Sequence, residues 1–378
     1  MDGKAFTKYE TDRPGFDGGS ISREEVTTIR SIASDPMRLR PPLGSARGPM
    51  RVMLLAAGLA TRLRPLSLAR PKVLVPILGT TMLDYWRRRL AQTGCRALVI
   101  NAFHLGDRLR AAVAERAWPF PVTVSVEQDL LGTGGGLRKA LPALGDGPLV
   151  VVNGDILCDA DLERLFEAHA RSMAPASLLV HDCPPFNNVA VDSDDRIVEF
   201  GAPALRLAAG RPELQLLAFT GIHVIDSHIL APFPDGCFLD ILQVHRQLIA
   251  QGRPPHALFQ PGLYWREMGS LAAYFALNRE LAAAVPGTVP ELPCGEQRRL
   301  DPGCVVGTGA QLGGLVVLGN GTEVGAGAVL TNVIAWDGVR IAPRSRIGNC
   351  ILADGAQVSG ELNDLAMAKD GACAPLNP

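Results

Sequence analysis

The chain has 378 residues, a formal net charge of −1 at pH 7 and 20% charged residues. That length is sufficient for a large core and about two domains, and the balanced charge excludes a general attraction to nucleic acid or to membrane surfaces. The eight cysteines are scattered without a C-x-x-C pair, which argues against a disulfide framework and a zinc site. No apolar run approaches the roughly 20 residues of a membrane span, and residues 1–49 contain no signal-peptide core. We therefore expect a cytoplasmic protein whose partners are neither nucleic acid nor membrane.

Residues 1–49 form the first distinct segment of the chain. They are polar, with scattered Gly, Pro and Arg, and show no apolar periodicity. Such a composition is typical of a disordered or loosely attached extension. The first core strand is expected to start only after it, at Arg51.

The segment 52–77 combines a short apolar run with small residues and cations. Val52–Leu55 is too short for a lone helix and suits a buried parallel strand, and residues 56–60 form a small-residue turn. Backbone N–H groups at the carboxyl edge of a parallel sheet can hold phosphate oxygens. Arg62 and Lys72 would add two cations to the same anion. The alternative is an ordinary strand-turn-helix unit with solvated arginines.

Apolar runs then alternate with amphipathic segments along the chain. This alternation is typical of a parallel sheet covered by helices on both faces. The expected fold class is therefore α/β, with a Rossmann-like, mostly parallel sheet. The expected helices are 82–92, 107–116 and 271–284, and the expected strands are 97–100, 122–126 and 149–155, with antiparallel strands over 177–225.

Two further segments place polar or flexible groups directly after strands. Residues 127–140, EQDLLGTGGGLRKA, follow a strand and precede a helix; alone, they would be interpreted as a flexible turn. Residues 149–155, LVVVNGD, are an apolar strand that ends in Asp155. A carboxylate at that end of a strand, in a cleft lined for phosphates, is a natural Mg²⁺ ligand. The alternative for Asp155 is a turn residue or the cap of the next helix.

Residues 55–76, LAAGLATRLRPLSLARPKVLVP, resemble the signature of the sugar-1-phosphate nucleotidyltransferases, L-A-[AG]-G-x-G-T-R-[LM]-x-P-L-T-x-x-x-P-K-x-L-x-P. The glycine-rich segment resembles the family's base-binding loop, E/Q-x-x-x-x-G-T-A-G-G. Asp155 falls on the metal-binding aspartate of the family's N-G-D. Residues 264–270, YWREMGS, match W-x-D-x-G-T and put Glu267 at the second metal carboxylate.

The resemblance implies an enzyme of the EC 2.7.7 class. A sugar 1-phosphate oxygen would attack the α-phosphate of an NTP and pyrophosphate would leave, which requires positioning and charge neutralisation more than covalent chemistry. In the implied roles, Arg62 holds the β- and γ-phosphates, Lys72 neutralises the α-phosphate and sugar phosphate, and Asp155 with Glu267 holds Mg²⁺. The implied nucleotide contacts are Leu55, Ala56, Ala57, Gly58, Thr61, Arg62, Glu127, Gly132 and Thr133, and the implied sugar contacts are Asn153, Glu199 and Gly221.

Three positions depart from the family pattern. Ala60 replaces the second loop glycine, and its Cβ disfavours a positive φ. Glu267 replaces an aspartate and reaches one methylene further, and Phe200 replaces the lysine that often follows Glu199. These departures keep a second interpretation open, a catalytically weak regulatory or sensor subunit that binds an NDP-sugar. The signature cations and Asp155 favour the enzyme.

Glu127 bears on the choice of nucleotide, because the resemblance places it toward the Watson–Crick edge of the base. A carboxylate only accepts hydrogen bonds. Guanine offers two adjacent donors, whereas uracil and thymine offer one donor between two carbonyl oxygens. We therefore favour GTP, with mannose 1-phosphate or a related hexose or heptose phosphate. UTP or dTTP with a hexose 1-phosphate remains the alternative, as does a purely loop-capping role for Glu127.

From residue 300 onward, apolar residues recur every six positions. This hexapeptide period predicts a short left-handed parallel β-helix over 300–362, with about three coils. It would follow a catalytic domain over 50–285 and a linker over 286–299, and precede a polar, frayed tail over 363–378. Since all seven histidines lie at or before His256, the β-helix has no histidine base for acyl transfer. We expect it to be structural and to offer a surface for homo-oligomer formation. The periodic residues are Leu300, Val306, Leu312, Leu318, Val324 and Leu330, with a slip near Trp336 before Ile341, Ile347 and Val358.

Overall fold

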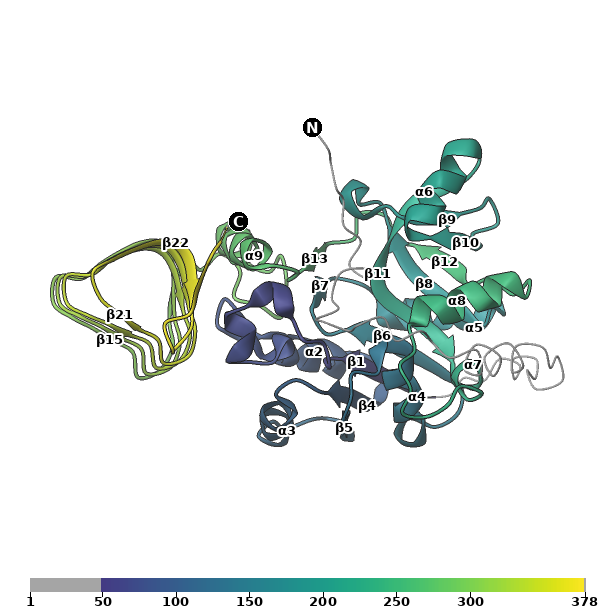
Figure 1. Cartoon of the computed structure of the whole chain (residues 1–378), viewed down its shortest axis with the longest axis horizontal. Coiled ribbons are helices and arrows are strands. Elements are labelled where there is room, and N and C mark those ends of the chain that lie inside the picture. The colour runs from purple at the N-terminus through teal and green to yellow at the C-terminus, as the bar shows by residue number, and fades with distance from the viewer. Residues whose placement is uncertain (1–48, 377–378) are drawn as a thin grey trace, which may run out of the picture.

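The computed structural model describes residues 49–376, so the expected N-terminal extension lies outside the described residues apart from its last position. Within 49–376, no helix has the length and apolarity needed to cross a membrane. A larger body of sheet and helices meets a triangular prism of strands beside helix α9, Leu271–Ala283 (Figure 1).

A nine-stranded sheet forms the centre of the larger body. Its main path has the order β10-β9-β11-β6-β1-β4-β5, and β8 and β12 extend it from β11. Strands β6, β1, β4 and β5 are mutually parallel, whereas β11 is antiparallel to β6. This arrangement confirms the expected mostly parallel sheet. The strands are β1 Met50–Leu55, β4 Cys95–Ala102, β5 Val122–Val126, β6 Pro148–Asn153, β8 Ala176–His181, β9 Val189–Val191, β10 Ile197–Phe200, β11 Gln215–Asp226 and β12 His256–Phe259.

Helices cover both faces of the sheet, because alternate residues of its strands point to opposite sides. Val52 and Leu54 face a core that includes α2, α3 and α9, whereas Met53 faces a second core with α4 and α8. The helices are α2 Met82–Ala91, α3 Gly106–Ala114, α4 Gly132–Leu144, α5 Leu162–Ser172, α6 Gly201–Gly210, α7 Ser227–Leu230, α8 Ile241–Ala250 and α9.

Helix α6 interrupts the region that the sequence predicts to be antiparallel strands only. The antiparallel pairing of β8 and β9 with β11 is present. Between β10 and β11, however, Ala204, Leu207 and Ala208 follow the i, i+3, i+4 spacing of a helix and pack on a small satellite core. The sequence of this segment therefore carries a helical period, and the expectation of strands alone is wrong for residues 201–210.

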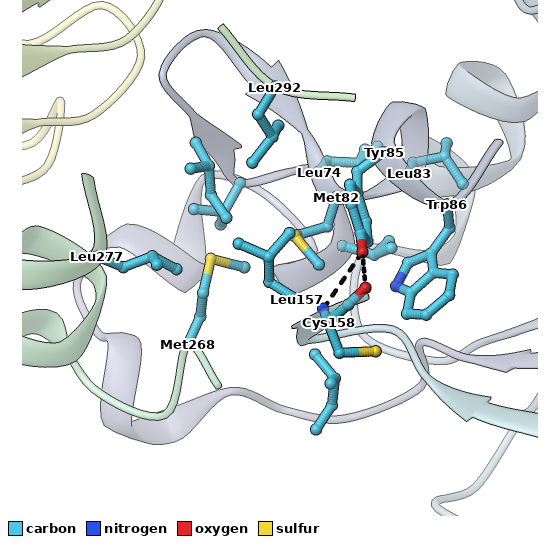
Figure 2. Close-up of a cluster of buried hydrophobic side chains, with 14 of the residues drawn as sticks. Leu74, Met82, Leu83, Tyr85, Trp86, Leu157, Cys158, Met268, Leu277 and Leu292 are labelled. Carbon is cyan, nitrogen blue, oxygen red and sulfur yellow. Dashed lines mark hydrogen bonds between the residues drawn. The ribbon is translucent and has the colours of Figure 1, made fainter. Parts of the chain in front are cut away.

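The core beneath residues 55–76, called the signature segment below, joins elements from far apart in the chain (Figure 2). The Tyr85 hydroxyl donates to the Cys158 carbonyl and accepts from the Cys158 N–H at 3.2 Å. Leu292 belongs to the same core, and Arg88 Nη1 donates to the Glu291 carbonyl at 2.6 Å. The expected linker over 286–299 is thus packed against the larger body. The residues labelled in Figure 2 are Leu74, Met82, Leu83, Tyr85, Trp86, Leu157, Cys158, Met268, Leu277 and Leu292.

The C-terminal prism is a parallel β-helix, as the six-residue period predicts. In register, Leu300 pairs with Leu318, Leu318 with Ala335 and Ala335 with Leu352, so the repeat shortens by one residue after the first coil. This shortening is the physical origin of the slip near Trp336. The strands are β14 Arg298–Leu300, β15 Val305–Val306, β16 Gln311–Leu318, β17 Glu323–Val324, β18 Val329–Ala335, β19 Arg340–Ile341, β20 Arg346–Leu352, β21 Gln357–Val358 and β22 Glu361–Met367.

The end of the β-helix differs from the expected frayed tail over 363–378. Strand β22 continues to Met367, and β23, Cys373–Pro375, pairs antiparallel with it. Leu376 is buried. The hairpin gives the open edge of the last coil a partner, and an unpaired parallel edge would otherwise invite association.

Two buried histidines lie between the sheet and α8. His223 on β11 and His245 on α8 have ring centroids 5.6 Å apart, and none of their ring nitrogens has a hydrogen-bond partner among the described residues. Burial lowers the pKa of His245 to about 3. Burial, followed by the charges of His245 and His169, lowers the pKa of His223 well below its usual value. Both rings are therefore neutral in the folded protein at neutral pH.

We predict that stability falls as the pH is lowered below about 6.5, the unfolded histidine pKa. Below that pH the unfolded chain binds protons that the folded core excludes, so the free energy of unfolding declines by up to about 1.4 kcal/mol per pH unit for each histidine. Urea unfolding between pH 4.5 and 7.5 measures this slope. His245→Leu should flatten it, and Gln243→Leu, an exposed position on the same helix, should leave it unchanged. Equal slopes in all three proteins would contradict the assignment.

Candidate active site

A cleft of about 210 Å³ lies at the carboxyl ends of β1, β4 and β6. This is the edge where open α/β sheets bind ligands. It brings together the signature segment, the glycine-rich loop and the end of β6, which the sequence separates widely. The lining residues are Leu55, Ala56, Ala57, Gly58, Lys72, Val73, Asn101, Glu127, Leu130, Gly132, Thr133, Asn153, Gly154 and Asp155.

An ion pair stands at one end of this cleft. Lys72 opens the short 3-10 helix η3, Lys72–Leu74, and Asp155 lies in the turn after β6. Lys72 Nζ is 2.5 Å from Asp155 Oδ2, and each side chain is 15% exposed. The pairing places a cation suited to phosphate and a carboxylate suited to a metal at the same point.

Asn101, which the sequence analysis did not single out, connects two walls of the cleft. Its Oδ1 accepts the Ala56 N–H at 2.7 Å, and its Nδ2 donates to Glu127 Oε1 at 2.7 Å. The other Glu127 oxygen accepts the Leu131 N–H at 3.2 Å. Burial raises the pKa of Glu127, although the Asn101 and Leu131 hydrogen bonds oppose the shift. A polar residue at the end of a predicted strand was the available signal for Asn101.

The glycines that the sequence predicts to lie in a loop belong to the first turns of α4, and close packing explains them. The N–H groups of Gly134 and Gly135 donate to the Leu239 carbonyl at 2.8 and 3.1 Å. A Cβ on Gly135 would lie 2.4 Å from the Cys237 carbonyl oxygen, a separation that no real side chain tolerates. The start of α4 is therefore held directly against the segment that precedes α8.

A two-stranded sheet that the sequence did not predict brings Glu267 toward Asp155. Strands β7, Ile156–Cys158, and β13, Trp265–Glu267, pair antiparallel, with Glu267 opposite Ile156. The Met268 N–H donates to the Asp155 carbonyl at 3.2 Å. A Cβ on Gly269 would lie 2.4 Å from Glu267 Oε1 and 3.6 Å from Arg62 Nη1. Arg62 and Glu267 thus converge beside the Asp155 end of the cleft without lining it.

The expected sugar contacts are placed differently from one another. Asn153 lines the cleft, and Gly221, at a φ of 81°, lies directly behind it, where a Cβ would approach Asn153 Nδ2 to 2.5 Å. Glu199 is not among the lining residues and accepts a hydrogen bond from Arg246 Nε at 2.9 Å. Arg246 Nη2 also donates to the Phe200 carbonyl at 3.1 Å, so a cation from α8 stands beside Glu199.

The carboxylates near the cleft fit the requirements of Mg²⁺. Within residues 49–376, no three His, Cys, Asp or Glu side chains cluster in the manner of a complete protein metal cage. Mg²⁺ commonly takes one or two carboxylates and completes its octahedron with water and substrate phosphates. Asp155, in the turn before β7, and Glu267, opposite the first residue of β7, are the pair that matches this pattern.

Ala60 occupies the position where the signature calls for glycine. Its backbone is left-handed, with φ 48° and ψ 43°, and its carbonyl accepts the Leu63 N–H at 2.9 Å in the first turn of η1, Thr61–Leu63. A left-handed conformation costs a residue with a Cβ about 1–2 kcal/mol. The loop therefore keeps the glycine geometry without the glycine.

We predict that Ala60→Gly raises the free energy of unfolding by about 0.5–1 kcal/mol, because relief of the Cβ clash exceeds the added entropy of an unfolded glycine. Urea denaturation measures the change. Ala69→Gly is the matched control, because Ala69 has a φ of −89° and the substitution should destabilise. A loss of stability in Ala60→Gly as large as in the control would refute the strain at this position.

Known proteins resemble this chain over most of its length. The family model for nucleotidyl transferases matches residues 51–284. A mannose-1-phosphate guanylyltransferase from Mycobacterium tuberculosis is 31% identical over 76% of this chain and 80% of its own. An N-acetylmuramate alpha-1-phosphate uridylyltransferase from Caulobacter vibrioides is 31% identical over 63% of this chain and 100% of its own, and a UTP–glucose-1-phosphate uridylyltransferase from Synechocystis is 26% identical over 83% and 82%. The chain therefore belongs to the nucleotidyl transferase family, as a sugar-1-phosphate nucleotidyltransferase.

Proposed function

We propose that this enzyme condenses GTP with mannose 1-phosphate, or a related hexose or heptose 1-phosphate, to give a GDP-sugar and pyrophosphate. The observation that carries the proposal is the Lys72–Asp155 pair at 2.5 Å in a cleft between two backbone loops. Transfer of a nucleotidyl group depends on positioning and on neutralising charge at phosphorus. Both requirements converge at this pair.

In this proposal, each cation binds a different part of the triphosphate, and the two carboxylates bind the metal ion. Lys72 neutralises the α-phosphate and the incoming sugar phosphate, and Arg62 binds the β- and γ-phosphates of the leaving pyrophosphate. Asp155 and Glu267 hold Mg²⁺, which when bound supplies further positive charge to the phosphate oxygens. Lys72 and Asp155 pair with each other at 2.5 Å, so the fold itself brings the cation for the phosphates and the carboxylate for the metal to one point.

The nucleotide lies between the signature turn and the start of α4. Backbone N–H groups of Ala57, Gly58, Gly132 and Thr133 approach it, because these residues line the cleft with little or no side chain between backbone and ligand. The Ala56 N–H is already used by Asn101, which fixes the turn in place. Such preorganised dipoles stabilise developing charge without reorganising during the reaction.

Glu127 supports guanine as the base. Glu127 lines the cleft, and the residue is 3% exposed. Asn101 Nδ2 and the Leu131 N–H occupy one acceptor position on each oxygen, and an ionised carboxylate has about four. The remaining capacity suits the two adjacent donors of guanine and repels the carbonyl oxygens of uracil or thymine. A site built for one donor pattern rejects a base that leaves its polar groups unpaired.

The sugar lies beyond the α-phosphate, toward Asn153 and Gly221. Asn153 reaches the cleft directly, and Gly221 allows the backbone of β11 to approach it. Glu199 completes this end of the site, with Arg246 as its cationic partner. The Glu199–Arg246 pair takes the place of the glutamate–lysine sequence that Phe200 interrupts.

We predict that Lys72→Ala and Asp155→Asn each lower turnover by about 10²–10³-fold, the usual cost of losing one preorganised electrostatic contact. The assay is pyrophosphate release from GTP, UTP, dTTP, ATP and CTP with a panel of hexose and heptose 1-phosphates and Mg²⁺. Unchanged far-UV circular dichroism controls for folding. A parent enzyme that binds an NDP-sugar but releases no pyrophosphate from any pair would instead support a sensor subunit, and near-normal turnover in either variant would remove the assigned role.

The nucleotide preference gives a separate prediction. The parent should show its highest kcat/KM with GTP, and Glu127→Gln should reduce that preference toward UTP and dTTP, because an amide can both donate and accept. Asp129→Asn removes an exposed carboxylate two residues away and serves as the matched control. A parent that uses UTP best, or a Glu127→Gln variant with the parent's ranking, would show that Glu127 only holds Asn101 and the following loop.

A further inference from the structure

Arg70 links the signature segment to the β-helix. It lies two residues before Lys72. Its guanidinium forms a bidentate pair with Asp354, in which Nε donates to Oδ2 at 2.7 Å and Nη2 donates to Oδ1 at 2.6 Å. Nη2 also lies 2.5 Å from Asp337 Oδ2, and the guanidinium stands 5.2 Å from the Trp336 ring centroid. The Arg70 side chain is only 15% exposed. The Arg70 guanidinium therefore contacts two carboxylates and one aromatic ring at the same time.

The two carboxylates are ordered by the β-helix itself. Asp337 and Asp354 follow β18 and β20, which are paired neighbours, and the Asp337 N–H donates to Asp354 Oδ1 at 3.2 Å. The other oxygen of Asp337 accepts the Asn320 N–H at 2.9 Å. Burial by itself would lower the pKa of Arg70. The hydrogen bonds to Asp354 and Asp337 and the negative charges of these two carboxylates outweigh burial, so the pKa of Arg70 is raised. The coils therefore present a preformed anionic socket to a permanently charged side chain.

A second connection reaches the other end of the same stretch. Trp336 Nε1 donates to the Tyr274 hydroxyl at 3.2 Å, and that hydroxyl donates to the Pro76 carbonyl at 2.6 Å. Trp336 and Tyr274 are buried, with exposed fractions of 1% and 0%. On α9, Asn278 Oδ1 accepts the Leu78 N–H at 2.8 Å. Residues 70–78 are consequently held at both ends by the β-helix and the helix beside it.

We infer that the β-helix positions the lysine-bearing segment of the active site, with Arg70 as the positioning residue held by Asp337 and Asp354. Only Pro71 separates Arg70 from Lys72, and its ring fixes φ, here −54°. A displacement of Arg70 is therefore transmitted to η3 instead of being absorbed by rotation. The inference rests on the proposed role of Lys72, and it gives the C-terminal prism a part in turnover besides its part in stability.

The test compares kcat, KM and stability in Arg70→Ala, Arg70→Lys and the double variant Asp337→Asn/Asp354→Asn. We expect kcat to fall about 10–100-fold in the first and third, the scale of a misplacement near 1 Å, while KM for the NTP changes little. Arg70→Lys keeps the charge but not the fork and should recover part of kcat. Arg70, Asp337 and Asp354 act through the same set of contacts. The kcat of the triple variant Arg70→Ala/Asp337→Asn/Asp354→Asn should therefore be no lower than that of Arg70→Ala.

Arg116→Ala provides a matched control for lost stability. Arg116, in the bend after α3, contacts both carboxylate oxygens of Asp84 on α2 through Nε and Nη2, each at 2.9 Å, and both side chains are 20% exposed. Neither residue lines the cleft. The Arg116→Ala variant should lose stability without losing kcat. If kcat in Arg70→Ala is unchanged, or falls no more than in Arg116→Ala, the inference is overturned.

Hydrogen–deuterium exchange separates this inference from the proposed function. The backbone amides of residues 72–75 and 77 should exchange faster in Arg70→Ala and in Asp337→Asn/Asp354→Asn than in the parent, and Arg116→Ala should leave them unchanged. Unaltered exchange in that segment would refute the positioning role even if the enzyme proves active. A parent without pyrophosphate release would refute the proposed reaction, while the exchange measurement would still decide whether the β-helix orders the segment.

Discussion

The pairing of Lys72 with Asp155 is the interaction on which the architecture of the site depends. The two residues lie 83 positions apart and meet at 2.5 Å. Parallel pairing of β1 with β6, in register from Arg51–Leu149 to Leu55–Asn153, places the ends of both strands at the same level. Leu74 of η3 packs into the core shown in Figure 2, and this packing holds η3 beside the ends of these strands. A mostly buried charge is costly unless it is paired, so the fold has to bring these two side chains together.

Side-chain bridges, more than glycine flexibility, shape the rest of the cleft. Asn101 accepts a hydrogen bond from the Ala56 N–H and donates one to Glu127, so one buried amide connects the signature turn to the other wall of the cleft. A Cβ on Gly136 would come within 2.8 Å of both Asn101 Nδ2 and Glu127 Oε1. Close packing around this bridge therefore requires a glycine at position 136 of α4. Removal of either partner would leave a buried polar group unsatisfied, which costs more than the hydrogen bond itself contributes.

The larger body and the β-helix share one hydrophobic core, although their sequences look independent. Val317, Ile334 and Ile351 on one face of the prism belong to the same buried cluster as Leu54 of β1 and Tyr274 of α9. The connecting segment contributes Leu292 to that cluster as well. This shared core places the coils of the β-helix directly against the signature segment, where Arg70 meets Asp337 and Asp354.

The sequence by itself determined the features that have a local period or a fixed pattern. Alternation and helical spacing predicted the parallel sheet and α2, α3 and α9, and the six-residue repeat predicted the β-helix. The left-handed backbone of Ala60 was found only in the structure, because its Cβ disfavours that conformation. Contacts between distant segments were decided only by the tertiary structure. The three-residue strands β7 and β13 are too short to show a period. Asn101 bonds to Ala56 and Glu127, 45 and 26 residues away, and Arg70 bonds to Asp337 and Asp354, 267 and 284 residues away. The physical reason is that periodicity records which face of an element is buried, whereas the identity of the segment that covers it depends on how the whole chain packs.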